Sequence, residues 1–294
     1  MYLEQYLKYL KEEKKLTGNS LDAYQRDLAD YVKYCETKGI DDLLKVENTH
    51  IVAYLLHLTE TGKSPSTLNR KLASIRAFYK YAMEMNWISK NPATNIKAPK
   101  IERKEIEYLT VDEVEKLLSM PGNETPKQKR DKAILELMYA TGIKVNELIA
   151  SNVEDINLRI GFFTCPGTIG KARIVPIGRK ARMAIEDYLN GARDELLKDN
   201  QDERALFVNF YGGRMSRQGL WKLLKAYGAK AGLEGKITPH ILRNSFAVHM
   251  VQNGADLKSL QELLGHEDIS ATQIYLSVMK NRIKDVYDHT HPRA

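Results

Sequence analysis

The sequence predicts a mainly α-helical protein with a small antiparallel β-sheet, divided into two domains. Apolar residues recur at three- and four-residue steps along much of the 294-residue chain, which is the period of an amphipathic helix. One cluster of short β-rich segments, punctuated by Gly and Pro, lies between residues 156 and 177. A charged stretch near residue 100 contains a proline and lacks helical periodicity, so it marks a domain boundary.

The N-terminal region is predicted to be helical throughout. Leu21, Leu28 and Cys35 belong to an apolar stripe of one helix, and a second periodic stretch follows Ser64-Pro-Ser66. Residues 1–60 hold 8 Lys/Arg against 11 Asp/Glu, whereas residues 61–100 hold 8 against 1. This second helix is therefore basic on one face, which favours contact with a phosphate backbone over a merely solvated face. The expected DNA-binding side chains on it are Asn69, Arg70, Arg76 and Lys80.

The domain boundary is placed in the charged stretch. The first domain is expected to span residues 1–98, a linker residues 99–108, and the second domain residues 109–294. Thr110-Val-Asp-Glu113 has the pattern of a capping box and predicts a helix start directly after the linker. In the strand cluster that follows, Arg173 is a further candidate DNA contact on a hairpin, with an exposed edge strand as the alternative.

Chemistry is concentrated near the C-terminus. Thr238-Pro-His-Ile-Leu-Arg-Asn-Ser-Phe-Ala-Val-His249 sets His240 and Arg243 three apart, on one face of a helix that starts near Pro239. Asp256 and Gly265 have the positions of an N-cap and a C′ stop, which puts His266 at a helix end. Tyr275 follows nine residues later.

These residue types suit the transfer of a phosphodiester to a tyrosine. A guanidinium matches two phosphate oxygens, histidines can donate to oxygens that gain charge, and a tyrosine hydroxyl can attack phosphorus. Each residue alone is ordinary, because most histidines are structural and the chain has 16 tyrosines. Their combined spacing is what indicates a catalytic site.

The chain resembles the tyrosine recombinases or phage integrases, and most closely the Xer-type members. The resemblance extends from the N-terminal helices through Ala140-Thr-Gly-Ile-Lys-Val-Asn-Glu-Leu148 and Arg173-Ile-Val-Pro-Ile-Gly178 to the C-terminus. It implies an N-terminal helical core-binding domain and a C-terminal tyrosine-recombinase catalytic domain. It also implies that Tyr275 is the nucleophile of a 3′-phosphotyrosyl intermediate, Arg243 a phosphate-clamping arginine, and His240 and His266 the flanking histidines.

Two positions depart from the family pattern. Lys144 stands where the family usually has its first catalytic arginine, and a lysine lacks the bidentate fork. The family's hairpin lysine corresponds to Thr168 by counting back from Arg173, or to Lys171 if the turn is formed differently. The sequence leaves both the register and the origin of Lys144, natural or engineered, open. A DNA-binding relative with weakened or lost cleavage is therefore the alternative to a working recombinase.

Composition agrees with a DNA-handling protein. The formal charge is +7, no apolar run is long enough for a membrane span, and two cysteines do not suggest a disulfide framework or a zinc site. We expect a cytoplasmic protein with no metal or cofactor and no membrane partner. The partners that the resemblance implies are double-stranded DNA and a homo- or hetero-tetramer, assembled through the tail around Met279 to Val286. The sequence does not reveal the DNA target site. It also does not reveal whether the biological role is chromosome resolution or mobile-element movement.

Overall fold

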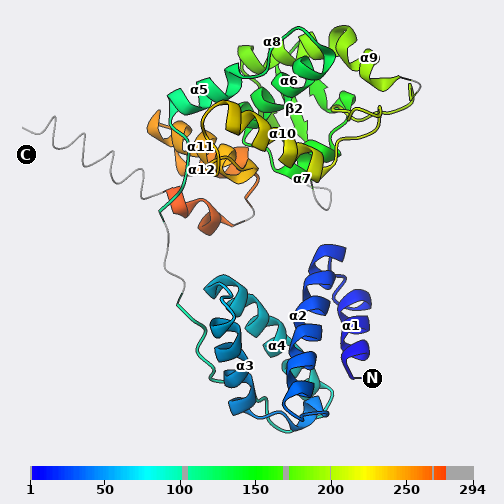
Figure 1. Ribbon diagram of the computed structural model, residues 1–294, viewed down its shortest axis with the longest axis vertical. Coiled ribbons are helices and arrows are strands. Elements are labelled where there is room, and N and C mark those ends of the chain that lie inside the picture. The colour runs from blue at the N-terminus through cyan, green and yellow to red at the C-terminus, as the bar shows by residue number, and fades with distance from the viewer. Residues whose placement is uncertain (1, 101–104, 168–171, 199, 267, 276–294) are drawn as a thin grey trace, which may run out of the picture. The chain divides into compact units, whose positions relative to one another are not determined.

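The computed structural model describes residues 2–100, 105–167, 172–198, 200–266 and 268–275. The chain forms two compact units, residues 1–104 and 105–294 (Figure 1). The division falls within the stretch expected to be the linker. Within the described residues, none of the helices is both long enough and apolar enough to cross a membrane.

The N-terminal unit is helical, as the sequence predicts (Figure 1). Its elements are α1 (Tyr2–Glu12), α2 (Gly18–Thr37), the short turn η1 (Leu43–Lys45), α3 (Asn48–Glu60) and α4 (Pro65–Glu84). The helix expected after Ser64 is α4, which begins with the Ser64 side chain accepting a hydrogen bond from Thr67 N and with a proline in the first turn.

Helices α2 and α4 pack through their apolar stripes and through a buried charge cluster. Leu28, Tyr31 and Cys35 of α2 are buried, as their spacing predicts. Asp27 is also buried and accepts hydrogen bonds from Arg70 and Ser74 of α4, while the Lys71 ammonium lies 3.4 Å from the same carboxylate. A buried carboxylate needs such partners.

The C-terminal unit is mixed, with helices around a small sheet. Its elements are α5 (Val111–Ser119), α6 (Pro126–Thr141), α7 (Val145–Ala150), η2 (Val153–Asp155), β1 (Ile156–Asn157), β2 (Phe162–Cys165), β3 (Arg173–Pro176), α8 (Arg179–Asp187), η4 (Tyr188–Ala192), α9 (Arg193–Leu197), α10 (Arg217–Lys230), α11 (Pro239–Gln252), α12 (Leu257–Leu264), η5 (Ile269–Ala271) and η6 (Gln273–Tyr275).

The sheet is antiparallel, with strand order β1-β2-β3. In the register of β2 and β3, Cys165 lies opposite Arg173 and Phe163 opposite Val175. The sequence correctly places the strands between residues 156 and 177. Because β3 is an edge strand, its first residue, Arg173, is able to reach toward the neighbouring helices.

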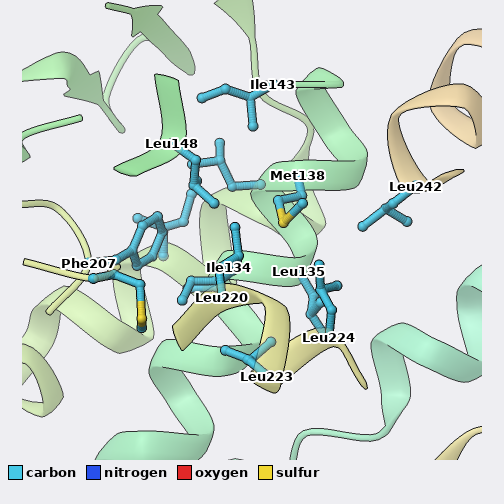
Figure 2. Packing of buried hydrophobic residues seen from close by; sticks show 14 of the residues in the cluster. Ile134, Leu135, Met138, Ile143, Leu148, Phe207, Leu220, Leu223, Leu224 and Leu242 are labelled. Carbon is cyan, nitrogen blue, oxygen red and sulfur yellow. The ribbon is translucent and has the colours of Figure 1, made fainter. Parts of the chain in front are cut away.

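Helix α6 forms the centre of the C-terminal core. Ile134, Leu135 and Met138 are buried against Leu220, Leu223 and Leu224 of α10 and Leu242 of α11 (Figure 2). Helix α6 is covered on several sides, and its buried residues include the charged Arg130, Asp131 and Glu136 as well as apolar side chains. It ends at Gly142, whose left-handed backbone (φ 57°) turns the chain toward α7. This turn lies beside α11.

Candidate functional site

Helix α11 presents the histidine and the arginine of the sequence motif. The Thr238 hydroxyl accepts a hydrogen bond from Ile241 N at 3.1 Å, and Pro239 occupies the first turn, so the helix begins where the sequence predicts. His240 and Arg243 both lie in this N-terminal part, with His240 exposed and Arg243 buried. Within the described residues, no hydrogen bond joins His240 to Arg243, and the two share only the helix.

Arg243 ties two chain turns together. Its guanidinium donates to Gly142 O at the end of α6, and Nη2 donates to Leu264 O at 2.7 Å at the end of α12. The same Nη2 lies 3.0 Å from Nε2 of His266. Burial lowers the pKa of Arg243 to about 10, so the group is still charged near neutral pH. This buried, forked cation is the strongest anion-binding group of the site.

His266 lies at the helix end that the sequence defines. Asp256 caps α12 by accepting from Lys258 N and Ser259 N, each at 2.9 Å, and Gly265 closes it with a φ of 61°. A side chain at Gly265 would collide with Arg173, because its Cβ would lie 2.8 Å from Nη1. The absence of a side chain there therefore lets Arg173 approach the histidine segment.

Glu147 and Arg173 form a bidentate ion pair beside His266. The guanidinium nitrogens Nη1 and Nη2 donate to the two Glu147 carboxylate oxygens at 2.7 and 3.0 Å, and Nε donates to Leu263 O at 2.7 Å. Burial alone would raise the pKa of Glu147, but hydrogen bonds from Arg173 and from Lys144 N hold it below its usual range. Arg173 therefore joins β3, α7 and α12.

Lys144 faces this cluster. Its backbone N donates to Glu147 Oε2 at 2.9 Å, and its ammonium donates to Gly265 O at 3.0 Å and lies 3.9 Å from Glu147 Oε1. The side chain is 47% exposed, so it borders solvent as well as the buried cations. These contacts tie the half-exposed lysine to the end of α12 and to Glu147.

Tyr275, the last residue of η6, packs against helix α11. Its ring is 2% exposed and belongs to an apolar cluster with Phe246, Val248 and Leu264. Its hydroxyl donates to Asn244 Oδ1 at 3.0 Å. Burial raises the pKa of Tyr275, and the charge of Arg243 opposes this. The hydroxyl is therefore protonated, and its hydrogen bond is accepted by the side-chain amide of Asn244.

The predicted site residues are only partly gathered. The structure brings Arg243, His266 and Lys144 into one cluster and places Tyr275 of η6 against α11, with its hydroxyl on Asn244, the residue after Arg243. Lys171 and Thr168 lie outside the described residues, so the register of the hairpin lysine stays a prediction. Arg173, expected to contact DNA, instead uses its guanidinium within the cluster.

The predicted DNA-binding residues of α4 have different surroundings. Asn69 Nδ2 donates to Pro99 O at 3.1 Å, and Arg76 donates to Ile96 O, so these two side chains hold the segment after α4. Arg70 pairs with Asp27, and Lys80 is 77% exposed beside Glu84. Arg76, named above as a candidate DNA contact on the basic face, is only partly exposed, because it packs against that segment.

Sequence reasoning missed two polar residues that contact the site. Asn244 directly follows Arg243 and holds the Tyr275 hydroxyl, and it also donates to Glu107 O at 3.1 Å. Thr272 lies three residues before Tyr275, and its hydroxyl is 2.8 Å from Nδ1 of His266. The sequence offered one sign of their role, which is that both lie close to motif residues along the chain.

The environment of His266 predicts a pH-dependent stability. Burial and then the charges of Arg243, Lys144 and Arg173 lower the pKa of His266 to about 4, with Glu147 opposing them. In the unfolded chain a histidine has a pKa of about 6.5, so the unfolded state binds more protons between these values and stability falls as the pH falls. We expect a loss of about 1 to 2 kcal/mol from this residue between about pH 7 and pH 5.

Denaturant unfolding at several pH values checks this expectation. His266→Asn removes the titrating group, so the decline in unfolding free energy toward pH 5 should be shallower in the variant than in the parent chain. Parallel curves would show that His266 does not contribute through its protonation, since the carboxylates titrate in both proteins.

Comparisons with known proteins identify the family of the chain. Residues 107–282 match the phage integrase family, and residues 3–86 match the phage integrase N-terminal SAM-like domain. The chain is 45% identical to the tyrosine recombinase XerD of Oceanobacillus iheyensis, over 99% of this chain and 98% of the relative. It is 43% identical to the XerD of Listeria monocytogenes, over 99% of both chains.

A solved structure extends the likeness to the fold. The XerH site-specific recombinase bound to a palindromic difH substrate superposes with a TM-score of 0.79 at 23% identity, over 97% of this chain and 82% of that one. Both domains of the chain are thus matched by family models, and near full-length relatives share more than two fifths of its residues. The chain therefore belongs to the phage integrase family and is a tyrosine-type site-specific DNA recombinase.

Proposed function

We propose that this recombinase cuts and rejoins double-stranded DNA through a covalent 3′-phosphotyrosyl link to Tyr275. The observation that supports it best is the convergence of Arg243, His266 and Lys144 at the junction of α6, α7, α11 and α12, with Tyr275 packed on the same α11. The curated relatives are named as recombinases, which favours this reaction over the alternative of a DNA-binding protein without cleavage.

Each member of the cluster has a distinct part in this reaction. The Arg243 fork is suited to two non-bridging phosphate oxygens, while Lys144 offers one charge at the rim. Both act where negative charge grows as the phosphorus is attacked, and their partial burial strengthens that interaction. His240 is exposed in the first turn of α11, where its imidazole is able to donate a hydrogen bond to a phosphate oxygen.

Tyr275 must change partners before it reacts. In this structure its hydroxyl donates to Asn244 and its ring is buried in an apolar cluster. Attack on phosphorus requires the hydroxyl to leave Asn244 and approach the phosphate bound at Arg243. The structure therefore represents a resting arrangement, and the segment that carries Tyr275 moves for catalysis.

DNA is the partner that the family and the charge favour. The solved relatives XerH and λ integrase were crystallised with recombination-site DNA, and this chain carries a net positive charge. Assembly into a homo- or hetero-tetramer through Met279 to Val286 stays a prediction, because that tail lies outside the described residues.

The exposed face of α4 is the proposed DNA-binding surface of the N-terminal unit. Arg70, Ala73 and Lys80 are exposed on this helix, and the small side chain of Ala73 would let a groove approach it. We expect Lys80→Ala to weaken DNA binding modestly and to reduce the slope of log affinity against log salt by about one, because one counterion fewer is released.

Lys8→Ala is the matched control for this measurement. Lys8 is 71% exposed and pairs with Glu12 four residues on, as Lys80 pairs with Glu84, but it lies on α1. Fluorescence anisotropy with a labelled duplex, repeated over a range of salt concentrations, gives both slopes. Equal slopes for the two variants would move the DNA-binding surface away from α4.

A nicked recombination site tests the proposed reaction itself. Cleavage beside a nick releases a short fragment that diffuses away, so a covalent protein–DNA intermediate accumulates. A protein band that is shifted on a denaturing gel and disappears on nuclease treatment is the expected product. Its absence with all candidate sites that bind the protein would count against the proposal.

A further inference from the structure

The ring of His266 is held at both nitrogens, and the two partners determine which nitrogen bears the proton. Nε2 lies 3.0 Å from Nη2 of Arg243, and Nδ1 lies 2.8 Å from Oγ1 of Thr272. A guanidinium has only donors, so Nε2 must accept. In the neutral ring the proton therefore resides on Nδ1, and the Thr272 hydroxyl oxygen accepts it.

The charges around His266 favour this neutral form. The ring is faced by Arg243 from α11, by Lys144 and Glu147 from α7, and by Arg173 from β3. Three cations against one carboxylate, together with burial, lower the pKa of His266 to about 4. A neutral imidazole has two tautomers, and in this site only the one with the proton on Nδ1 satisfies both neighbours.

Thr272 also belongs to the segment that carries the proposed nucleophile. Its side chain is fully buried, its N donates to Ile269 O at 2.8 Å, and its O accepts from Tyr275 N at 3.1 Å. One residue thus contacts the ring of His266 through its side chain and the backbone of Tyr275 through its carbonyl.

We propose that Thr272 is a positioning residue of the recombination reaction: Arg243 leaves the His266 proton on Nδ1, and the Thr272 hydroxyl accepts that proton's hydrogen bond and so holds the ring with Nε2 toward the phosphate-binding Arg243. The catalytic part of this inference rests on the proposed function of Tyr275, whereas the tautomer does not. When one ring nitrogen of a histidine faces the reacting group, the hydrogen-bond partner of the other nitrogen sets the orientation of the ring. In His266 the second nitrogen is Nδ1. Thr272 is that partner.

Thr272→Val and Thr272→Ser separate the hydroxyl from the shape of the side chain. Valine keeps the volume but cannot accept a hydrogen bond, so a buried Nδ1–H loses its partner. We expect Thr272→Val to slow phosphotyrosine formation in single turnover on a nicked site by at least about tenfold, with DNA affinity unchanged. Thr272→Ser should stay within about threefold of the parent rate.

Nitrogen NMR of the His266 ring supplies a readout that needs no reaction. The DNA-free parent and Thr272→Ser should show a protonated Nδ1 whose N–H is hydrogen-bonded, and an unprotonated Nε2. Thr272→Val should keep this tautomer, because Arg243 still faces Nε2, but its ring signals should shift because the hydrogen bond of the Nδ1–H is lost. Parent-like ring signals and rate in Thr272→Val would overturn the proposal, as would a Thr272→Ser as slow as Thr272→Val. If the parent chain forms no phosphotyrosine at all, the proposed function fails, yet the ring signals still decide the tautomer.

Discussion

Tyr275→Phe is expected to abolish the covalent protein–DNA product and to leave DNA binding intact. The change removes one oxygen, the only atom of the side chain able to form a bond to phosphorus. Because the ring is buried in an apolar cluster, phenylalanine fills the same space. The hydrogen bond to Asn244 is lost, which costs about 1 kcal/mol of stability and does not threaten the fold.

The measurement compares variants on the same nicked duplex. Tyr139→Phe is the matched control, because the Tyr139 hydroxyl also makes one side-chain hydrogen bond, to His249 Nδ1 at 2.9 Å, in a partly buried position. It should form the shifted band at the parent level. A band of equal intensity in Tyr275→Phe would show that another residue is the nucleophile, and peptide mapping of the DNA-linked fragment would then identify it.

Local patterns were enough to predict the elements that carry the motif. Helix periodicity, a proline in the first turn and capping residues act between near neighbours, so they can be read along the chain. The starts of α5 and α11, the end of α12 at Gly265 and the three short strands all follow from such signals. The spacing of His240 and Arg243 also follows, because both lie on one helix.

Long-range partners could not be predicted in this way. Arg173 and Glu147 are 26 residues apart, and nothing near either residue reveals that they form a bidentate pair. The same holds for Arg76, whose partner Ile96 O belongs to the segment after α4. A basic residue on a helical face looks the same in sequence whether it contacts solvent, DNA or its own backbone.

The site residues that the sequence missed are uncharged. Asn244 and Thr272 act through single hydrogen bonds to Tyr275 and His266, and such residues are common at helix starts and turns for unrelated reasons. Only the folded chain shows that Asn244 holds the Tyr275 hydroxyl, the proposed nucleophile, and that Thr272 holds the ring of His266. The motif residues therefore depend on neighbours that the motif does not include. The hydrogen bond of His266 to Thr272 must be kept, and that of Tyr275 to Asn244 must be broken before the hydroxyl can react.

Lys144→Arg is expected to raise the rate of phosphotyrosine formation by at least about tenfold at nearly constant DNA affinity. The Lys144 ammonium already lies in the cluster, at 3.0 Å from Gly265 O, and the half-exposed side chain leaves room for a longer one. An arginine can meet two phosphate oxygens where a lysine meets one. A charged donor in such a position is typically worth on the order of 100-fold in rate, while binding to a long DNA site changes little.

Single-turnover kinetics on the nicked site, with parent and variants prepared together, measure this gain. Lys144→Ala is the companion variant, and it should be slower than the parent because the ammonium is lost from beside His266 and Glu147. If Lys144→Arg equals the parent while Lys144→Ala is slow, lysine already serves fully at this position. If all three react alike, residue 144 does not face the phosphate, and the contact of Lys144 with Gly265 O serves only to join α7 to the end of α12.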